Sequence, residues 1–477
     1  MTKDTGWDHA LKVTGSGKRL VGHAGAMLLR KLADRAGLTA ALGPALGRPG
    51  RFPLVDRGVA LVSMAVAIAL GATSMNDIAV LAHQEPVLGA APSDTTVRRT
   101  LELADERTLG KIAKARARVR ARVWSLIEAT PAGFPWLAIA GKLLAGWLVI
   151  DLDGTLITAR SDKEGAAPTF KKGYGFHPLG AWLANTLEAL AMLLRPGNAG
   201  SNTFADHATV LTAAIGQIPA RMRARLLVRV DGAGASHELI SHLLSLTTRL
   251  RTVLFTCGWA ITEADEQAIA KLPAAAWQAG LDQDGTAQHD KHAAEITHLT
   301  SRAGRWPGGL RWIVRRAKPS RRQARNLTTF EKATGWRYSI IVTNIPGTGI
   351  KGVPGTHHPQ FIDVLHREHA VVEDGVRAGK AMGLRNLPSK AWAVNCGWVL
   401  AANIAADLSA WCRLLGLYDQ DDLKDAEPDT LRYRLWHLPA RLARHARQRV
   451  LKISRTWPWN EAFLACWQRL CALPEPA

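Results

Sequence analysis

The first part of the chain, residues 20–130, has a helical pattern throughout. Alanine, leucine and arginine dominate, residues typical of strands are scarce, and breaks fall at Gly47–Pro49 and Pro86. The longest apolar run, Val59–Ala72, is shorter than the ~20 residues that cross a membrane, so we expect a buried helix there. The pattern predicts an all-α domain.

From residue 147 onward, short apolar runs rich in β-branched residues replace this pattern. Trp147–Asp153 and Leu226–Asp231 each predict a buried strand that ends in a carboxylate, and Ser236–Leu246 predicts a helix after the second. Gly180–Leu194 fits either a strand or a helix. The order strand, acid, turn, helix is typical of α/β proteins, in which functional groups lie at the carboxyl ends of strands.

Residues 250–350 alternate short apolar runs with polar and basic stretches. We predict strands at Val253–Thr256, Leu310–Arg315 and Trp336–Thr343. Beyond them, Phe361–Met382 and Ala391–Leu415 predict two long helices, one charged and one mostly buried. A basic tail, Arg432–Arg455, follows.

The charge balance points to a polyanionic partner. The chain has 61 Lys and Arg against 40 Asp and Glu, a net charge of +21. Such an excess of positive charge repels itself in a folded protein, which favours a nucleic acid as partner; a generally basic composition is the alternative.

The 47% of hydrophobic residues indicate a globular protein. Five scattered cysteines without a CxxC pair argue against disulfides or a thiolate zinc site and fit a reducing cytoplasm. The first twenty residues lack the apolar core of a signal peptide.

Two N-terminal segments carry candidate DNA contacts. Thr73–His83 and Pro92–Leu101 resemble a helix-turn-helix, whose second helix, capped by Ser93, would present Arg98 and Arg99 to DNA. Lys111–Val123 carries six cations on a predicted helix with no acid among them. Phosphate contact and a solvated helix face are equally good interpretations of that run.

Three carboxylates have the arrangement needed to hold two divalent cations. Asp153 and Asp231 end predicted strands, and Glu373 lies on a late helix. Mg²⁺ prefers oxygen ligands, and two ions ~3.5–4 Å apart activate the attacking oxygen and stabilise the leaving oxygen of a phosphoryl displacement. Asp151 is the alternate ligand, because residues i and i+2 point to one side of a strand. Strand-end aspartates also cap helices, so the chemistry alone leaves the structural interpretation open.

In three segments the chain resembles the DD-E transposases of bacterial insertion sequences, most closely the insertion-sequence group numbered thirteen-eighty. Asp153–Thr155 is similar to the family's Asp-x-Thr/Ser, and Gly173–Pro178 to the strand that follows it. Arg229–Gly232 is similar to the segment around the second Asp.

The third segment resembles the family pattern Tyr, two residues, Arg, three residues, Glu, six residues, Lys. Glu373 and Lys380 match it, whereas His366 and His369 stand where Tyr and Arg belong. A neutral His is a weaker phosphate contact than Arg. On one continuous helix these four residues share a face, which would address metal and DNA together.

The resemblance implies an α/β fold with an RNase H-like catalytic core and an inserted mainly-β subdomain. An all-α DNA-binding domain precedes the core, and a helical C-terminal region follows it. The implied boundaries are 1–135 for the helical DNA-binding domain, 145–250 for the first part of the core, 251–350 for the β-rich insertion, 351–415 for the second part with the Glu373 helix, and 416–477 for the basic helical C-terminal region.

The resemblance also implies metal-dependent cleavage at insertion-sequence ends and cut-and-paste strand transfer into target DNA. Two Mg²⁺ ions, with Mn²⁺ as a substitute, would be held by Asp153, Asp231 and Glu373. The implied partners are the terminal inverted repeats, target DNA and a second copy of the chain on DNA, with no membrane; the implied location is the bacterial cytoplasm, at the nucleoid. Further candidate DNA contacts are His369, Lys380, Arg377 (with pairing to Glu373 as its alternative), and Trp306 or Trp312, which would stack on a displaced base.

Two alternatives stay open. Val149–Leu156 also resembles the nucleophile loop of haloacid-dehalogenase-type phosphatases, with Asp151 as nucleophile, Asp153 as acid/base and Thr256 as phosphate contact. Those enzymes need a later strand ending in paired acids, and Asp282 and Asp284 lie in a polar loop. The other alternative is a decayed transposase that binds DNA without cutting it.

Overall fold

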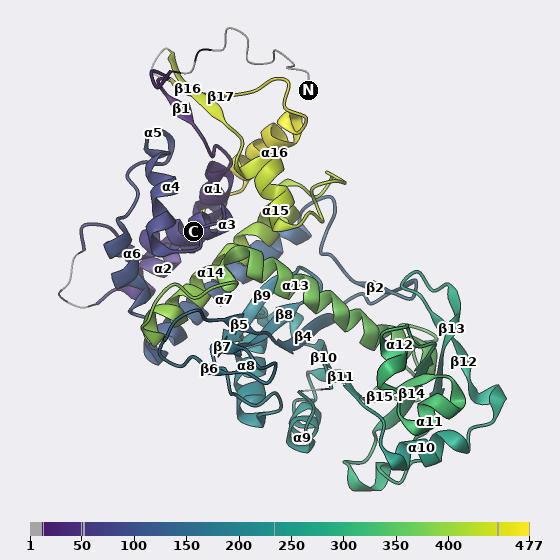
Figure 1. Ribbon diagram of the computed structural model, residues 1–477. Coiled ribbons are helices and arrows are strands. Elements are labelled where there is room, and N and C mark those ends of the chain that lie inside the picture. Colours follow the sequence, from purple (N-terminus) through teal and green to yellow (C-terminus); the bar gives the residue numbers. More distant parts are fainter. Residues whose placement is uncertain are drawn as a thin grey trace, which may run out of the picture.

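The computed structural model describes residues 12, 14–48, 50, 53–232, 234–445 and 448–476. Its centre is a nine-stranded mixed sheet in the order β12-β13-β14-β15-β11-β10-β4-β8-β9. Helices from both ends of the chain gather over the β9 end of this sheet, and the strands β12–β15 form its other end (Figure 1). The α/β class predicted from the sequence is confirmed.

One half of the sheet has five strands, namely β4 (Leu148–Gly154), β8 (Leu179–Leu183), β9 (Glu188–Leu193), β10 (Arg225–Val230) and β11 (Thr252–Trp259). β4, β8 and β9 form an antiparallel meander, whereas β10 and β11 run parallel to β4. This order and these directions are the RNase H topology. β10 and β11 are buried along almost their whole length, as parallel strands covered on both faces must be, which explains their continuous apolar runs.

The insertion extends the same sheet. Its strands are β12 (Gln278–Leu281), β13 (Ala287–Glu295), β14 (Arg311–Ala317) and β15 (Arg337–Thr343). They pair in antiparallel fashion, and β15 joins them to β11. The short helices between them are α10 (Glu263–Ala270), η3 (Ala274–Ala276), η4 (Ala303–Arg305), η5 (Gln323–Asn326) and α11 (Thr329–Thr334). Of the three strands predicted over residues 250–350, two are β14 and β15, and the third is β11 of the five-stranded half.

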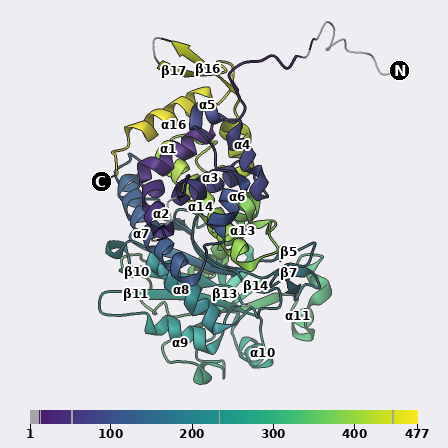
Figure 2. The same ribbon diagram turned by 90° about the vertical axis from the view of Figure 1, so that its left-hand side faces the viewer.

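Long helices cover the faces of the sheet. α8 (Phe204–Gln217) packs on β8 and β9, α9 (His237–Ser245) on β11, and α12 (Pro359–Arg367) on β12 and β13. α7 (Glu106–Glu128) packs against α8, and α14 (Trp392–Gly416) packs between β9 and the N-terminal helices (Figure 2). α14 is long and apolar enough to cross a membrane, but 83% of its most apolar window is buried inside the protein, so it is explained as a core helix.

The N-terminal elements are β1 (Leu20–Val21), α1 (Ala26–Ala36), α2 (Leu38–Leu46), α3 (Arg57–Ala69), η1 (Met75–Ile78), α4 (Ala79–Ala82), α5 (Glu85–Leu88) and α6 (Asp94–Leu101). The predicted buried helix is α3, in which every residue from Ala60 to Ala69 is buried. Ser93 caps α6 as predicted, since its Oγ accepts a hydrogen bond from the Thr96 amide at 3.2 Å.

The C-terminal region differs from the helical prediction. It contains α15 (Pro428–Leu431), η8 (Arg432–Trp436), a hairpin of β16 (Ala440–His445) and β17 (Gln448–Ile453), and α16 (Asn460–Ala472). β16 also pairs with β1 at the other end of the chain. Ala440 and Leu442 are buried and Arg441 is exposed, a period of two that the density of arginines obscures in the sequence.

The single helix predicted over Phe361–Met382 is interrupted. It consists of α12, the 3₁₀ turn η6 (Glu368–Ala370), α13 (Val371–Gly379) and the π-helical turn η7 (Lys380–Leu384). Gly383 has a φ of +87°, which is outside the range of a right-handed helix. Gly379 ends α13 and Gly383 lies in η7; each weakens a helix by ~1 kcal/mol relative to alanine, which favours the second break. Short connecting elements elsewhere are β2 (Ala138–Ile139), β3 (Lys142–Leu143), β5 (Ile157–Thr158), β6 (Ala167–Pro168), β7 (Tyr174–Phe176) and η2 (Ala220–Met222).

Candidate active site

Asp153 and Asp231 lie side by side at one edge of the sheet. Leu152 of β4 pairs with Val230 of β10 in a parallel register, so the next residue on each strand is an aspartate. Both carboxylates are partly buried. Burial, together with the neighbouring Asp231 carboxylate, raises the pKa of Asp153 to about 6. The strand ends therefore concentrate negative charge where solvent screens it weakly.

Asp151 has a different environment from Asp153. Its carboxylate is 1% exposed and accepts two hydrogen bonds from Arg229, from Nε at 2.6 Å and Nη2 at 2.7 Å. His369 Nδ1 lies 2.9 Å from the same carboxylate. Burial acts to raise the pKa of Asp151, but Arg229 and His369 outweigh it and hold that pKa below its usual value. Both oxygens of Asp151 are thus engaged within the protein.

Glu373 approaches these aspartates from α13. Its side chain is exposed and makes no hydrogen bond or ion pair with the described residues. Its carboxylate contributes to the raised pKa of Asp153, so it lies within electrostatic reach of that group. Lys380, in the following turn, is half-buried; burial and Lys171 lower its pKa, and Asp153 opposes that shift. The structure therefore brings Asp153, Asp231, Glu373 and Lys380 to one edge of the sheet.

The side-chain atoms at this edge of the sheet are of the chemical type that binds divalent cations. Carboxylate oxygens are the ligands that Mg²⁺ prefers, and a cation would relieve the repulsion between Asp153 and Asp231. His369 adds an unused donor atom, because its Nε2 is buried and has no hydrogen-bond partner. Among the described residues no three His, Cys, Asp or Glu side chains are already close enough to hold one ion. Glu373 is exposed and the described residues hold it in no hydrogen bond or ion pair, so its side chain can turn toward the aspartates.

Three buried cationic or imidazole groups near the aspartates were not predicted from the sequence. His177 Nδ1 lies 3.0 Å from the Ala199 carbonyl and His207 Nδ1 3.0 Å from the Thr203 carbonyl. Burial lowers the pKa of both imidazoles, and both lie within electrostatic reach of Asp231. Arg195 is 3% exposed, and its Nη2 has no hydrogen-bond partner.

The glycines beside the two aspartates leave room for these imidazoles. A Cβ on Gly154 would lie 2.8 Å from His177 Nε2, and a Cβ on Gly234 would lie 2.7 Å from His207 Nε2. A glycine directly after the first aspartate was the only sequence signal for this packing.

His366, at the Tyr position of the predicted motif, packs on β11. Its Nδ1 lies 3.1 Å from Thr256 Oγ1, and its ring occupies the space over Gly258, where a Cβ would lie 2.5 Å from Nε2. Burial, followed by the charges of His369 and Arg229, lowers the pKa of His366 to about 3. The rings of His366 and His369 stack at 6.4 Å, so His366 belongs to the group of side chains around Asp151.

The two candidate tryptophans of the insertion differ in accessibility. Trp312 is 0% exposed, lying beneath Trp259 and Trp306 with the Arg302 guanidinium 5.1 Å from its ring centre. No face of Trp312 is free to stack on a base, so the structure does not support that prediction. Trp306 is only partly buried and stacks on His237 at 4.8 Å.

The N-terminal cations divide into two groups. Arg98 and Arg99 are exposed on α6, where Arg98 pairs with Glu102 at 3.0 Å. On α7, Lys111, Lys114 and Arg118 are exposed, but two other cations of the run serve the core. Arg116 and Arg120 are buried and pair with Asp407 at 2.7 Å, and Arg120 also pairs with Glu188 at 2.7 Å. Phosphate contact is excluded for these two arginines by their burial.

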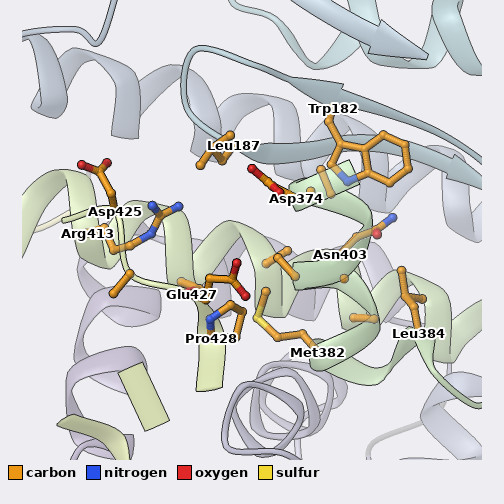
Figure 3. A pocket seen from close by; sticks show the side chains of 18 residues that line it. Trp182, Leu187, Asp374, Met382, Leu384, Asn403, Arg413, Asp425, Glu427 and Pro428 are labelled. Atoms are coloured by element: carbon orange, nitrogen blue, oxygen red, sulfur yellow. The ribbon is translucent and has the colours of Figure 1, made fainter. Parts of the chain in front are cut away.

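A cavity behind α13 is separate from the carboxylates. Trp182, Met382 and Asn403 line it together with the charged groups Asp374, Arg413, Asp425 and Glu427 (Figure 3). Arg377 pairs with Asp374 and, at 3.2 Å, with Glu427 on the rim of this cavity. Arg377 therefore pairs with neither Glu373 nor, in this arrangement, any group at the aspartates.

Carboxylates at two adjacent strand ends are chemically suited to hold divalent cations. The family model described as transposase DDE domain group 1 matches residues 4–475. The chain therefore belongs to this family of DDE transposases. No curated protein matches it significantly.

A solved structure similar to the chain is the piggyBac transposase synaptic complex with hairpin DNA, determined by cryo-EM. The identity is 11%, the TM-score is 0.42, and the match covers 86% of this chain and 79% of that chain.

The phosphatase alternative is not supported. The family match covers residues 4–475 with a transposase domain. The nucleophile of that alternative, Asp151, is buried in its ion pair with Arg229, and Thr256 is bonded to His366. Asp282 and Asp284 are exposed in the loop between β12 and β13, far along the sheet from β4.

Proposed function

We propose that this chain cuts DNA at the ends of a mobile element and joins the freed ends to target DNA, using Asp153, Asp231 and Glu373 to hold two Mg²⁺ ions, with Mn²⁺ able to replace them. The observation that carries the proposal is the parallel register that sets Asp153 and Asp231 side by side, with Glu373 within electrostatic reach. When bound, the ions activate the attacking oxygen and stabilise the leaving oxygen.

The protein groups around these carboxylates position them and the DNA. The ion pair of Asp151 with Arg229 fixes β4 against β10, and the hydrogen bond from the Gly234 amide to Asp231 Oδ1, at 3.0 Å, orients the second carboxylate. Lys380 lies near Asp153 and supplies a positive charge for a phosphate group. Positioning and charge neutralisation supply most of the acceleration in this chemistry.

The finer assignments belong to the same proposal. They are membership of the insertion-sequence group thirteen-eighty, a bacterial host and a cytoplasmic location at the nucleoid, a homodimer on DNA, and cut-and-paste transposition. The segments around Asp153, Asp231 and Glu373 that resemble that group support the first. The net charge of +21 supports the nucleic-acid partner.

The test is cleavage of linear DNA that carries both ends of the element encoding the chain, with Mg²⁺ or Mn²⁺. Wild type should cut, whereas Asp153→Asn, Asp231→Asn and Glu373→Gln should bind the ends and not cut them. Asp374→Asn is the matched control, because Asp374 is the exposed neighbour of Glu373 and points to the cavity behind α13. Binding without cleavage by wild type would indicate a decayed transposase and would overturn the proposed activity.

A further inference from the structure

A strongly basic segment follows β14. Between Arg311 and Arg325 all seven charged side chains are cations. Arg311 and Arg315 are neutralised by Glu295 and Asp363. The other five, which we call the basic ledge, make no ion pair with an acid in the described part of the chain; they are Arg316, Lys318, Arg321, Arg322 and Arg325. All of the ledge except the partly buried Arg316 is exposed.

Two tryptophans hold the base of this ledge. The Arg316 guanidinium lies between the rings of Trp277 and Trp336, at 4.1 and 4.6 Å from their centres, and Lys318 Nζ lies 3.9 Å from the centre of Trp336. Arg316 Nε is buried without a hydrogen-bond partner. Rings that restrain long cationic side chains lower the entropy lost when those side chains bind an anion. Cations interleaved with aromatic rings are a typical surface for nucleic acids.

The sheet topology places the ledge on the same edge as the aspartates. β14 and β11 are both antiparallel to β15, so β14 runs parallel to β11, and β11 is parallel to β10. The carboxyl end of β14 therefore points the same way as the ends that carry Asp153 and Asp231. In Figure 2, α11, which follows the ledge, lies on the same side of the sheet as β5 and β7, which follow β4.

The strand registers give the offset of the ledge from the site. Asp231 is level with Gly258, Gly258 pairs with Ile341, and Ile341 pairs with Ile313. The backbone of Arg316 thus lies three residues beyond the level of Asp231, about 10 Å, and three strands away, about 14 Å, and because three is odd its side chain leaves the other face of the sheet. The combined offset of roughly 17 Å corresponds to about five base pairs of duplex at 3.4 Å per step.

From this placement we infer that the basic ledge binds the sugar–phosphate backbone of duplex DNA about 4–6 base pairs from the bond that is cut. The inference rests on the proposed function, because it takes the carboxylates as the cleavage point. The ligand is backbone phosphate irrespective of base sequence, since lysine and the unsupported arginines present donors and no shaped pocket.

The experiment is fluorescence anisotropy with duplexes that carry the element end and are extended stepwise on either side of the cleavage point. The ledge variant is Arg321→Gln/Arg322→Gln/Arg325→Gln, whose three side chains are exposed and make no hydrogen bond in the described structure, so it should fold like wild type. The matched control is Arg225→Gln/Arg249→Gln/Lys351→Gln, which removes the same charge from exposed residues at the opposite edge of the sheet.

On duplexes that reach past the ledge, the ledge variant should bind about tenfold more weakly than wild type, and the slope of log affinity against log salt should fall by about 2–3. On duplexes that stop within 3 base pairs of the cleavage point, the ledge variant and wild type should bind equally. The control variant should match wild type on both. Trp336→Leu, which keeps every charge, should give an intermediate loss on long duplexes only.

Equal losses for the ledge and control variants would mean that bulk charge alone is measured and would overturn the inference. So would a loss that does not depend on duplex length. Failure of the proposed function would give a different result. No element end would be cut, yet a duplex of unrelated sequence would still show binding that depends on the ledge and on duplex length.

Discussion

Asp151 and Arg229 form a buried, two-pronged ion pair between neighbouring parallel strands, with both side chains 1% exposed. They face each other because Asp151 pairs with Arg229 in the register of β4 and β10. Two residues further along the same strands stand Asp153 and Asp231. The ion pair therefore fixes the register that sets the two proposed metal ligands side by side.

Removing one partner of this pair should strongly destabilise the protein. Asp151→Ala leaves the Arg229 charge buried and unpaired, at a cost of about 3–5 kcal/mol. The shift of the denaturant midpoint measures it, and loss of cleavage should follow loss of folded protein. In the double variant Asp151→Leu/Arg229→Met no buried charge is left, so much of the stability should return. A single variant as stable as wild type would show that the pair does not hold the strands.

Unlike Asp151, which stabilises the fold through its ion pair, the ionised carboxylate of Asp153 should destabilise the folded protein. Because its folded-state pKa of about 6 lies above the unfolded value of 3.8, the folded protein keeps a proton that the unfolded chain has lost. Metal-free stability should therefore fall as pH rises from about 4 to 6, by at most about 3 kcal/mol. Asp153→Asn should lack this loss, and at pH 7 it should be more stable than wild type while inactive.

Denaturant unfolding of both proteins in chelator, at pH 4, 5, 6 and 7, checks this. The difference between them should vanish at pH 4 and below, and adding Mg²⁺ at pH 7 should narrow it. If Asp153→Asn were the less stable protein at pH 7, the carboxylate would be stabilised by a partner other than a metal.

The sequence predicted the strands of the core well, because a strand buried on both faces is a continuous apolar run that ends in a polar residue. It could not decide between Asp151 and Asp153. Both point to one side of β4, and what separates them is Arg229 on another strand, at a register that no local pattern encodes. The same limit applies to His177, His207 and Arg195, which reach the aspartates only through the fold.

The breaks in the predicted helix over Phe361–Met382 show a second limit. The spacing of His366, His369 and Glu373 predicts one face only on a continuous α-helix. The helix is interrupted by the 3₁₀ turn η6; His366 packs over Gly258 and stacks on His369. The turn η6 contains no glycine, and its His369 bonds Asp151, so tertiary packing accounts for the break there better than local helix preference does.

Substitutions of buried and exposed cations on the basic helix α7 should have different effects, the former on stability and the latter on DNA binding. Arg120→Leu leaves the carboxylates of Glu188 and Asp407 without one of their partners in the core, so a destabilisation of about 3–5 kcal/mol is expected. Arg118→Gln, on the exposed face of the same helix, should keep full stability and reduce the salt slope of DNA binding by about 1. Unfolding curves and salt-titrated binding measure the two effects. An Arg118→Gln protein with unchanged DNA binding would assign that face to solvent.

Substitutions of Trp306 and Trp312 should also have different effects, on DNA cleavage for Trp306 and on stability for Trp312. Trp312→Ala removes a side chain that is 0% exposed and should cost about 3–5 kcal/mol of stability, whatever DNA is present. Trp306→Ala should leave the fold intact and reduce cleavage of the element end if its ring stacks on a displaced base, a contact worth about 1–3 kcal/mol. A substrate that already lacks the base at that position should be cut equally by Trp306→Ala and wild type. Unequal cutting of that substrate would exclude base stacking as the role of Trp306.

Gly154→Ala tests whether the imidazole behind Asp153 matters for the site. The new Cβ would lie 2.8 Å from His177 Nε2, so either the ring or the strand end must move, and Asp153 moves with the strand end. Cleavage should fall at least tenfold while DNA binding is kept, because a small misplacement of a metal ligand is enough to lose that much. Gly216→Ala is the matched control: nothing lies within 4 Å of its Cβ position, and on helix α8 the same change should stabilise the protein by about 0.5–1 kcal/mol. Replacing His177 by Ala in the Gly154→Ala background removes the clash and should restore part of the cleavage. A double variant no better than Gly154→Ala would mean that the glycine is needed for backbone reasons, and that His177 does not position Asp153.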